Sequence, residues 1–92
     1  MESPLESCLQ SLMKDEDVTG CMLADKHGLC LAAAGKAHPE ATGLVAAVAH
    51  QVAKLEPSLP PPVILLEADN RKCLIQQSST LTAAIFKNNV TA

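Results

Sequence analysis

The chain has 92 residues, which suits a single domain, and it carries seven basic against ten acidic residues. Hydrophobic residues make up 48% of it, but Phe86 is the only aromatic, so aliphatic side chains and alanine must build the core. The lack of stacking side chains and of a basic surplus argues against nucleic acid as a partner. A domain this small buries limited surface alone, so a partner surface would add stability.

No apolar run reaches the ~18 residues of a membrane-spanning helix, and the amino terminus is acidic where a secretory signal is basic. Neither a myristoylation nor a prenylation motif is present. We therefore expect a cytosolic protein with no direct membrane insertion, attached to membranes only through partners. The cysteines at positions 8, 21, 30 and 73 form no C-x-x-C pair, so we expect free thiols.

The first predicted element is a helix that begins at Ser3 and Pro4. A capping hydroxyl, a proline in the first helical position and Glu6 three residues after the cap are typical of a helix start. Apolar residues then recur at helical spacing, at Leu5, Cys8, Leu9 and Leu12. The charged stretch 14–17 ends this pattern and predicts a solvated connector.

Two short apolar segments, Val18 to Ala24 and Leu29 to Ala34, predict a β-hairpin. Between them, Asp25 and Gly28 suit the first and fourth places of a type I turn with a G1 bulge. A chemical interpretation competes, because Asp25, His27 and Cys30 are residue types that bind zinc or activate nucleophiles. Zinc needs about four converging ligands, and no second cluster completes the set, so the turn interpretation is preferred.

A second helix is predicted from Pro39 to Leu55, with Pro39 and Glu40 in its first turn. We expect its sheet-facing side to hold Ala41, Leu44, Val45, Val48, Val52 and Leu55. The opposite side then collects mostly small residues: Thr42, Gly43, Ala46, Ala47, His50, Ala53 and Lys54. Either a second helix packs closely there, or the side is alanine exposed to solvent. We favour packing, because the chain has no other helix long enough to cover this side.

The segment 56–62 (EPSLPPP) ends this helix and predicts a stiff linker. Three strands are predicted after it: Val63 to Glu67, Cys73 to Gln77 and Leu81 to Lys87. The order helix, two strands, helix, three strands predicts an α+β domain with one five-stranded antiparallel sheet and helices on its faces. We expect one domain over 1–92, ordered from about residue 3 to 87, with a flexible tail over 88–92.

The sequence predicts no enzyme. Its four glycines are isolated, so no phosphate-binding loop is present. Cysteine and histidine could pair, but none of the combinations of Cys21, Cys30 and Cys73 with His27, His38 and His50 has a catalytic spacing. We expect no catalytic residue, no cofactor and no metal. A small thiol or metal-binding protein that uses Cys21, Cys30 and His27 stays open as an alternative.

Three motifs resemble the roadblock/dynein light chain family: the D-x-x-G-L-x-L hairpin from Asp25 to Leu31, the helix end at Ala49 and Val52 to Leu55, and L-E-x-D-N at 66–70. The likeness runs from Leu5 to Lys87. It implies a roadblock/LC7-like (profilin-like) domain that dimerises through its central helix and the following strand. The implied partner interface comprises Gly43, Ala46, Ala47, His50, Ala53, Lys54, Val63, Ile64, Leu65 and Leu66.

Within that family the sequence looks most like the roadblock-type subunits of the Ragulator complex, which implies a non-enzymatic scaffold. Such a subunit heterodimerises with a second roadblock-like subunit, and a lipid-anchored subunit wraps around two such pairs. The assembly holds Rag GTPases at the cytosolic face of lysosomes for amino-acid-dependent mTORC1 activation. These are the implied partners and location. A homodimeric, dynein-associated roadblock light chain is the alternative within the family.

Overall fold

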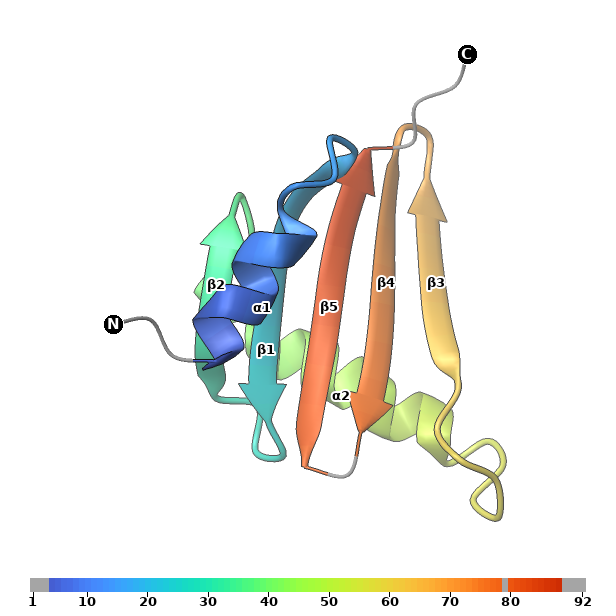
Figure 1. Cartoon of the computed structure of the whole chain (residues 1–92). Coiled ribbons are helices and arrows are strands. Elements are labelled where there is room, and N and C mark those ends of the chain that lie inside the picture. Colours follow the sequence, from blue (N-terminus) through green and yellow to red (C-terminus); the bar gives the residue numbers. More distant parts are fainter. Residues whose placement is uncertain (1–3, 79, 89–92) are drawn as a thin grey trace.

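The computed structural model describes residues 4–78 and 80–88. Its elements are α1 (Pro4–Leu12), β1 (Val18–Asp25), β2 (Cys30–Gly35), the 3₁₀ helix η1 (Pro39–Ala41), α2 (Thr42–Ala53), β3 (Val63–Ala68), β4 (Arg71–Ser78) and β5 (Leu81–Asn88). Within these residues the strands form one antiparallel sheet in the order β2-β1-β5-β4-β3, with a helix on each face (Figure 1). The predicted α+β architecture is confirmed.

Helix α1 covers one end of the sheet. It begins at Pro4, as predicted, and lies over β1 and β2. Leu9, only 3% exposed, packs into a cluster with Cys21 and Leu23 of β1. The predicted cap, Ser3, lies outside the described residues. No helix in the described part of the chain is long and apolar enough to cross a membrane.

The turn between β1 and β2 has the predicted geometry. Oδ1 of Asp25 accepts hydrogen bonds from the backbone N–H groups of His27 (2.8 Å) and Leu29 (2.9 Å). The N–H of Gly28 donates to the Asp25 carbonyl at 3.0 Å, and Gly28 adopts φ +86°. The strand register shifts between Leu23 and Ala24. The interpretation of this stretch as a bulged hairpin turn is therefore confirmed.

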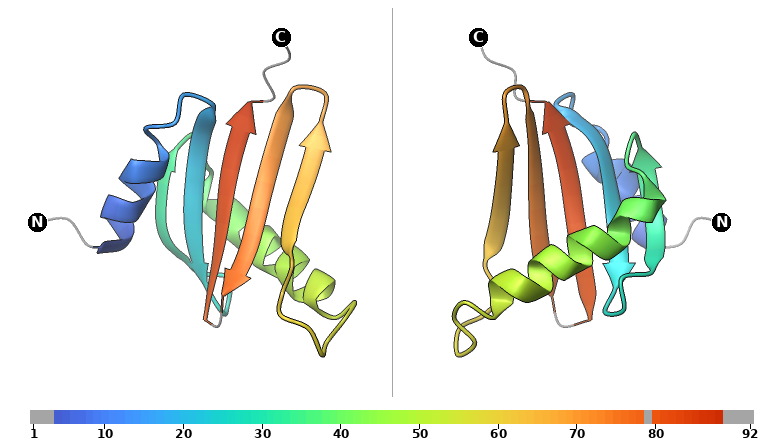
Figure 2. Two further views of the ribbon diagram at one scale, coloured as in Figure 1. Left: turned by 45° about the vertical axis from the view of Figure 1, so that its right-hand side comes forward. Right: turned by 180° about the vertical axis from the view of Figure 1, so that it is seen from behind.

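Helix α2 crosses the other face of the sheet diagonally, over β1, β5 and β4 (Figure 2). Its buried stripe follows helical spacing and consists of Thr42, Val45, Ala46 and Ala49. The predicted orientation was wrong for Leu44 and Leu55, which are 73% and 79% exposed, and for Thr42 and Ala46, which are 4% and 3% exposed. The physical reason is volume: strand side chains such as Met22 and Ile75 fill this layer, so small helix residues fit against them.

The last strand is one residue longer than predicted. The backbone N–H of Asn88 donates to the carbonyl of Asp17 at 2.9 Å and extends β5 through residue 88. Asn88, which was assigned to the tail, therefore belongs to β5. The rest of the expected flexible tail, 89–92, lies outside the described residues.

Candidate functional site: a free sheet edge and the outer side of a helix

Strand β3 forms an edge of the sheet, since within the described residues it pairs only with β4. One row of its backbone N–H and C=O groups is therefore free to pair with another strand. Its side chains are apolar and largely exposed: Val63 is 59% exposed, Leu65 49% and Leu66 47%. Edge strands in soluble proteins are usually protected by charges or bulges. The only charged residue in β3 is Glu67, near its end.

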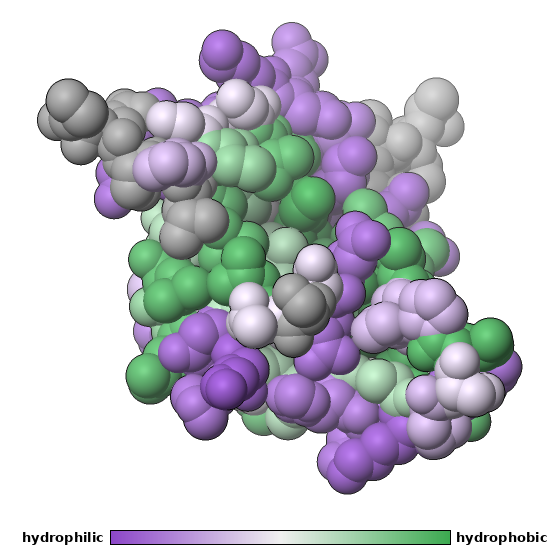
Figure 3. Space-filling view, turned by 60° about the horizontal axis from the view of Figure 1, so that its bottom comes forward, coloured by the Kyte–Doolittle hydropathy of each residue, from purple (hydrophilic) through white to green (hydrophobic). Residues whose placement is uncertain are grey.

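The C-terminal end of α2 lies near the start of β3 (Figure 2), and the outer side of this helix is a second exposed surface. The outer side of α2 is the name used below for the exposed residues of the helix and of the two positions after it: Gly43, Leu44, Ala47, His50, Gln51, Lys54 and Leu55. Leu44 and Leu55 on this side are more exposed than the two leucines of β3. The loop that follows adds Leu59, 56% exposed, and at this corner of the molecule a few apolar side chains lie among more hydrophilic ones (lower right in Figure 3). Exposed apolar groups that adjoin one another mark an interaction surface more strongly than scattered ones do.

Most of the ten predicted interface residues lie on this surface. Seven are exposed, namely Gly43, Ala47, His50, Lys54, Val63, Leu65 and Leu66, and Ala53 and Ile64 are half-buried. Ala46 belongs to the chain's own core. The sequence prediction missed Leu44 and Leu55, because it assigned the largest apolar residues of the helix to the sheet. The alternative stripe that begins at Thr42, a residue suited to a helix start, would have placed both leucines outward.

His50 is exposed but held by contacts within the chain. Its Nε2 lies 3.4 Å from the Lys26 carbonyl oxygen in the hairpin turn. Its Nδ1 lies 3.5 Å from Nε2 of Gln77 on β4. The imidazole thus spans two elements beside α2, and it gives the outer side of the helix a fixed polar group among small and aliphatic neighbours.

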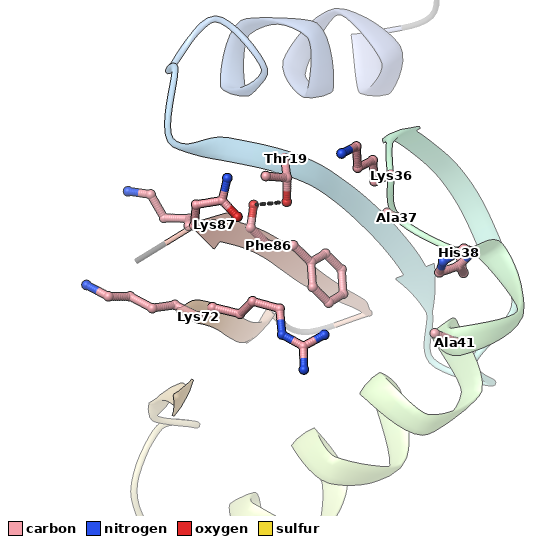
Figure 4. Close-up of a pocket in the computed structure, with 10 residues that line it drawn as sticks. Thr19, Lys36, Ala37, His38, Ala41, Lys72, Phe86 and Lys87 are labelled. Atoms are coloured by element: carbon pink, nitrogen blue, oxygen red, sulfur yellow. Dashed lines mark hydrogen bonds between the residues drawn. The ribbon is translucent and has the colours of Figure 1, made fainter. Parts of the chain in front are cut away.

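A cavity of about 420 Å³ opens near the start of α2, on the same face of the sheet (Figure 4). We call it the cationic pocket; it is lined by Thr19, Lys36, Ala37, His38, Ala41, Arg71, Lys72, Phe86, Lys87 and Asn88. The Phe86 side chain points toward Ala41, and the Thr19 hydroxyl donates to the Phe86 carbonyl at 3.2 Å. Sequence reasoning did not find this pocket, because its cations come from separate segments of the chain.

The thiol and imidazole groups do not form a reactive cluster. Cys21 is fully buried beneath α1, while His27 is exposed at the hairpin tip and Cys30 lies on β2. In the ranges 4–78 and 80–88, no three His, Cys, Asp or Glu side chains are grouped so that they could hold a metal. Burial raises the pKa of the Cys21 thiol, with a further contribution from Cys8, and burial also raises that of Cys73. Reactive cysteines have a lowered pKa instead.

The sequence also matches a known family. The family model described as Ragulator complex protein LAMTOR5 matches residues 1–87. The chain belongs to this family. A LAMTOR5 homolog from Nematostella vectensis is 40% identical over 88 residues, which cover 95% of this chain and 97% of the relative. LAMTOR5 from Xenopus tropicalis is 34% identical over 89 residues, which cover 95% of this chain and 97% of the relative.

Solved structures show that this LAMTOR5-family chain has the roadblock/LC7 fold, as predicted. A roadblock/LC7 domain from Streptomyces avermitilis has a TM-score of 0.72 at 18% identity and covers 95% of this chain and 80% of that one. MglB from Myxococcus xanthus has a TM-score of 0.83 at 19% identity and covers 98% and 80%. An MglB structure with a tetrameric arrangement has a TM-score of 0.74 at 17% identity and covers 96% and 75%.

Proposed function

We propose that this chain is a non-enzymatic scaffold subunit of a Ragulator complex, and that it acts by heterodimerising with a second roadblock-like subunit. Membership of the LAMTOR5 family supports the complex. The observation that carries the pairing is the free, apolar edge of β3, together with the exposed outer side of α2, whose C-terminal end lies near the start of β3. A strand of the partner would extend the sheet, while a partner helix would cover Leu44 and its neighbours.

The proposed interface combines two kinds of interaction. Backbone hydrogen bonds along β3 supply alignment, because they form only in a matched register. The exposed leucines on α2 and β3 supply the apolar area, worth about 25 cal/mol for each Å² removed from water. The interface is therefore the predicted one with two changes: Leu44 and Leu55 join it, and Ala46 leaves it because its side chain is already covered.

The proposed role in the larger assembly is based on the family to which the chain belongs. We propose that the pair joins a larger assembly with a lipid-anchored subunit, and that this assembly holds Rag GTPases at the lysosomal surface for amino-acid-dependent mTORC1 activation. In that assembly the chain is the counterpart of the subunit called hepatitis B virus X-interacting protein. Its contribution is a shaped surface rather than chemistry, which agrees with the raised pKa values of the Cys21 and Cys73 thiols.

The test uses three leucine-to-arginine variants that are matched in chemistry. Leu44→Arg and Leu66→Arg alter the proposed interface, and Leu31→Arg alters a leucine on β2, at the opposite edge of the sheet, whose exposure (45%) is close to that of Leu66 (47%). The chain is co-expressed with candidate roadblock-like subunits, and the recovered partner is quantified. We expect the first two variants to weaken pairing by at least about tenfold and Leu31→Arg to pair normally.

Equal recovery of the partner with all three variants would show that the chain pairs elsewhere. Sedimentation of the purified chain addresses the dynein-type alternative. A stable homodimer that Leu44→Arg and Leu66→Arg dissociate, together with no recovery of a different roadblock subunit, would replace the heterodimer proposal. Circular dichroism of each variant controls for folding, because all three positions are exposed and an arginine there should leave the fold intact.

A further inference from the structure

The cationic pocket has a chemistry that the pairing surface lacks. Its base is apolar, since the half-buried Phe86, Ala37 and Ala41 pack against the main core cluster. Its rim carries the exposed side chains Lys36, His38 and Arg71. Lys72 and Lys87 also line it, but their ammonium groups point away from the Phe86 ring (Figure 4). An aromatic base beside cations is suited to a ligand that is both apolar and anionic.

The charge of the pocket opposes that of the whole chain. The net charge is −3, yet four of the seven basic residues line this one cavity, and no aspartate or glutamate does. Among the described residues only Lys87 has a carboxylate within ion-pair distance, that of Asp15 at 3.8 Å. Lys36 and Arg71 therefore keep their charges available for a ligand. A local excess of cations in an acidic protein indicates complementarity to an anion.

The exposure of the rim favours a peptide over a metabolite. Sites for small molecules enclose most of the ligand and place their polar groups inside. Here Lys36, His38 and Arg71 are all exposed, so the pocket can surround one anchoring side chain while the charges meet its neighbours at the surface. Interfaces are often built this way, with an anchor in a pocket and a charged rim.

We propose that the cationic pocket docks an acidic segment of a partner protein, with an aromatic or aliphatic side chain over Phe86 and an adjacent Asp or Glu against Lys36 and Arg71. The inference rests on the proposed scaffold role, because it gives the scaffold a second contact. The pocket is formed by β1, β4, β5 and the segment from Lys36 to Ala41, without any residue of β3. Pairing through β3 and docking in the pocket therefore use different residues, although Arg71, Lys72 and Phe86 also line a neighbouring hollow that includes Leu66 and Glu67 of β3.

The experiment measures peptide binding to the chain, alone or in its native pair, by fluorescence anisotropy and amide NMR shifts. The probe is a labelled peptide, Gly-Ser-Asp-Phe-Glu-Ser-Gly, and its control has Lys in place of Asp and Glu. We expect the acidic peptide to bind and to shift the amides of Lys36, Ala41 and Phe86. The double variant Lys36→Glu/Arg71→Glu should bind about tenfold more weakly.

The matched control is Lys14→Glu/Lys26→Glu, which makes the same change in net charge at two exposed lysines outside the pocket. It should bind within about twofold of the unmodified chain. Equal losses for both double variants would show nonspecific charge attraction and overturn the proposal. So would an absence of shifts at the pocket amides.

A third measurement tests whether the anion that binds the pocket is a peptide carboxylate or a small phosphate compound. Phenyl phosphate presents an aromatic ring and a charge without a peptide backbone. If it binds at the same amides more tightly than the acidic peptide, the site is one for a small phosphate-bearing ligand, and the peptide proposal is wrong. Recovery of the roadblock partner is measured in parallel with Lys36→Glu/Arg71→Glu. We expect it to be unchanged, so failure of the docking proposal is distinct from failure of the pairing proposal.

Discussion

The hydroxyl oxygen of Thr42 lies 2.9 Å from the carbonyl oxygen of Gly28, so the first residue of α2 is tied to the tip of the β1–β2 hairpin. It lies equally close to the Pro39 carbonyl, and Thr42 is only 4% exposed. A small residue is also needed on the other side of this contact, because a Cβ on Gly28 would come within 3.3 Å of Gly43 Cα. These contacts fix the rotation of the helix and thereby turn Leu44 outward.

The first prediction concerns this hydroxyl. Thr42→Val keeps the shape of the side chain but removes the hydroxyl that can donate to the Gly28 or the Pro39 carbonyl. The Pro39 carbonyl keeps the backbone N–H of Thr42 as a donor, so the Gly28 carbonyl is the group left without one of its partners. We expect the free energy of unfolding to fall by about 1–3 kcal/mol, measured by urea denaturation at fixed protein concentration. Thr80→Val, at an exposed turn position, is the matched control and should change it by less than about 0.5 kcal/mol. Equal effects at both positions would show that the Thr42 hydroxyl does not stabilise the helix start.

The second prediction concerns the end of β2. Gly35 has φ +66°, and a Cβ there would meet the backbone at Thr19 and Gly20. Gly35→Ala should therefore reduce the free energy of unfolding by about 3 kcal/mol, from backbone strain and overlap. Gly43→Ala is the control, since nothing lies within 4 Å of the added methyl group and alanine favours helix. It should raise stability by up to about 1 kcal/mol. A Gly35→Ala chain as stable as the unmodified one would contradict the described geometry.

The sheet and its turns could be predicted from the sequence because their signals are local. Asp25 and Gly28 specify the hairpin through the turn's own backbone, and the alternation around them specifies the strands. The rotation of α2 could not be predicted in this way. Its sequence TGLVAAVAHQVA is small or apolar on nearly every side, so two stripes compete, and a long-range bond from Thr42 favours one of them.

The candidate site also has one part that could be predicted from the sequence and one part that could not. The strand predicted from Val63 to Glu67 was expected at an interface from the family resemblance, and the structure places this strand, β3, at the sheet edge. The cationic pocket had no signal in the sequence, because Lys36 and Arg71 are far apart in the chain. They line one cavity only after folding has brought the start of β4 close to the segment before α2. Local sequence patterns predict helices and strands, whereas a pocket depends on how the helices and strands are arranged in space.

The third prediction is a pH dependence that originates at Asp25. The backbone N–H of Leu29, helped by that of His27, lowers the pKa of this carboxyl below its ordinary value. The unfolded chain therefore binds the proton more readily than the folded chain. The stabilisation is complete above the ordinary value of about 3.9 and is lost as the pH falls through the lower folded value.

The measurement compares thermal unfolding of the unmodified chain and Asp25→Asn between about pH 3 and pH 6. The variant should be less stable near pH 6, and the difference should narrow as the pH falls. Asp69→Asn, in the turn between β3 and β4, is the matched control for the loss of one negative charge. If the difference between the unmodified chain and Asp25→Asn stays constant across this range, the carboxylate does not hold the hairpin turn through its charge.

The fourth prediction concerns the four thiols, which differ in exposure. Cys8 is exposed on α1, whereas Cys21 is fully buried beneath that helix, where its thiol donates to the Leu9 carbonyl with Sγ 3.6 Å from the oxygen. Burial also raises the pKa of the Cys21 thiol, which lowers its thiolate fraction. With iodoacetamide at about pH 8, we expect Cys8 to be alkylated at least about 100-fold faster than Cys21, as followed by peptide mass spectrometry.

A packing variant shows whether α1 is the cause of that protection. Leu9→Ala removes the 3%-exposed side chain that packs beside Cys21 and should cost about 2–5 kcal/mol. Because Cys73 lies on the opposite face of the sheet, on the side of α2 rather than α1, and is half-buried, its alkylation is a reference that local release of α1 should leave unchanged. Local release of α1 should speed alkylation of Cys21 more than that of Cys73. Equal acceleration of both thiols would mean that α1 separates from the sheet only when the whole domain unfolds.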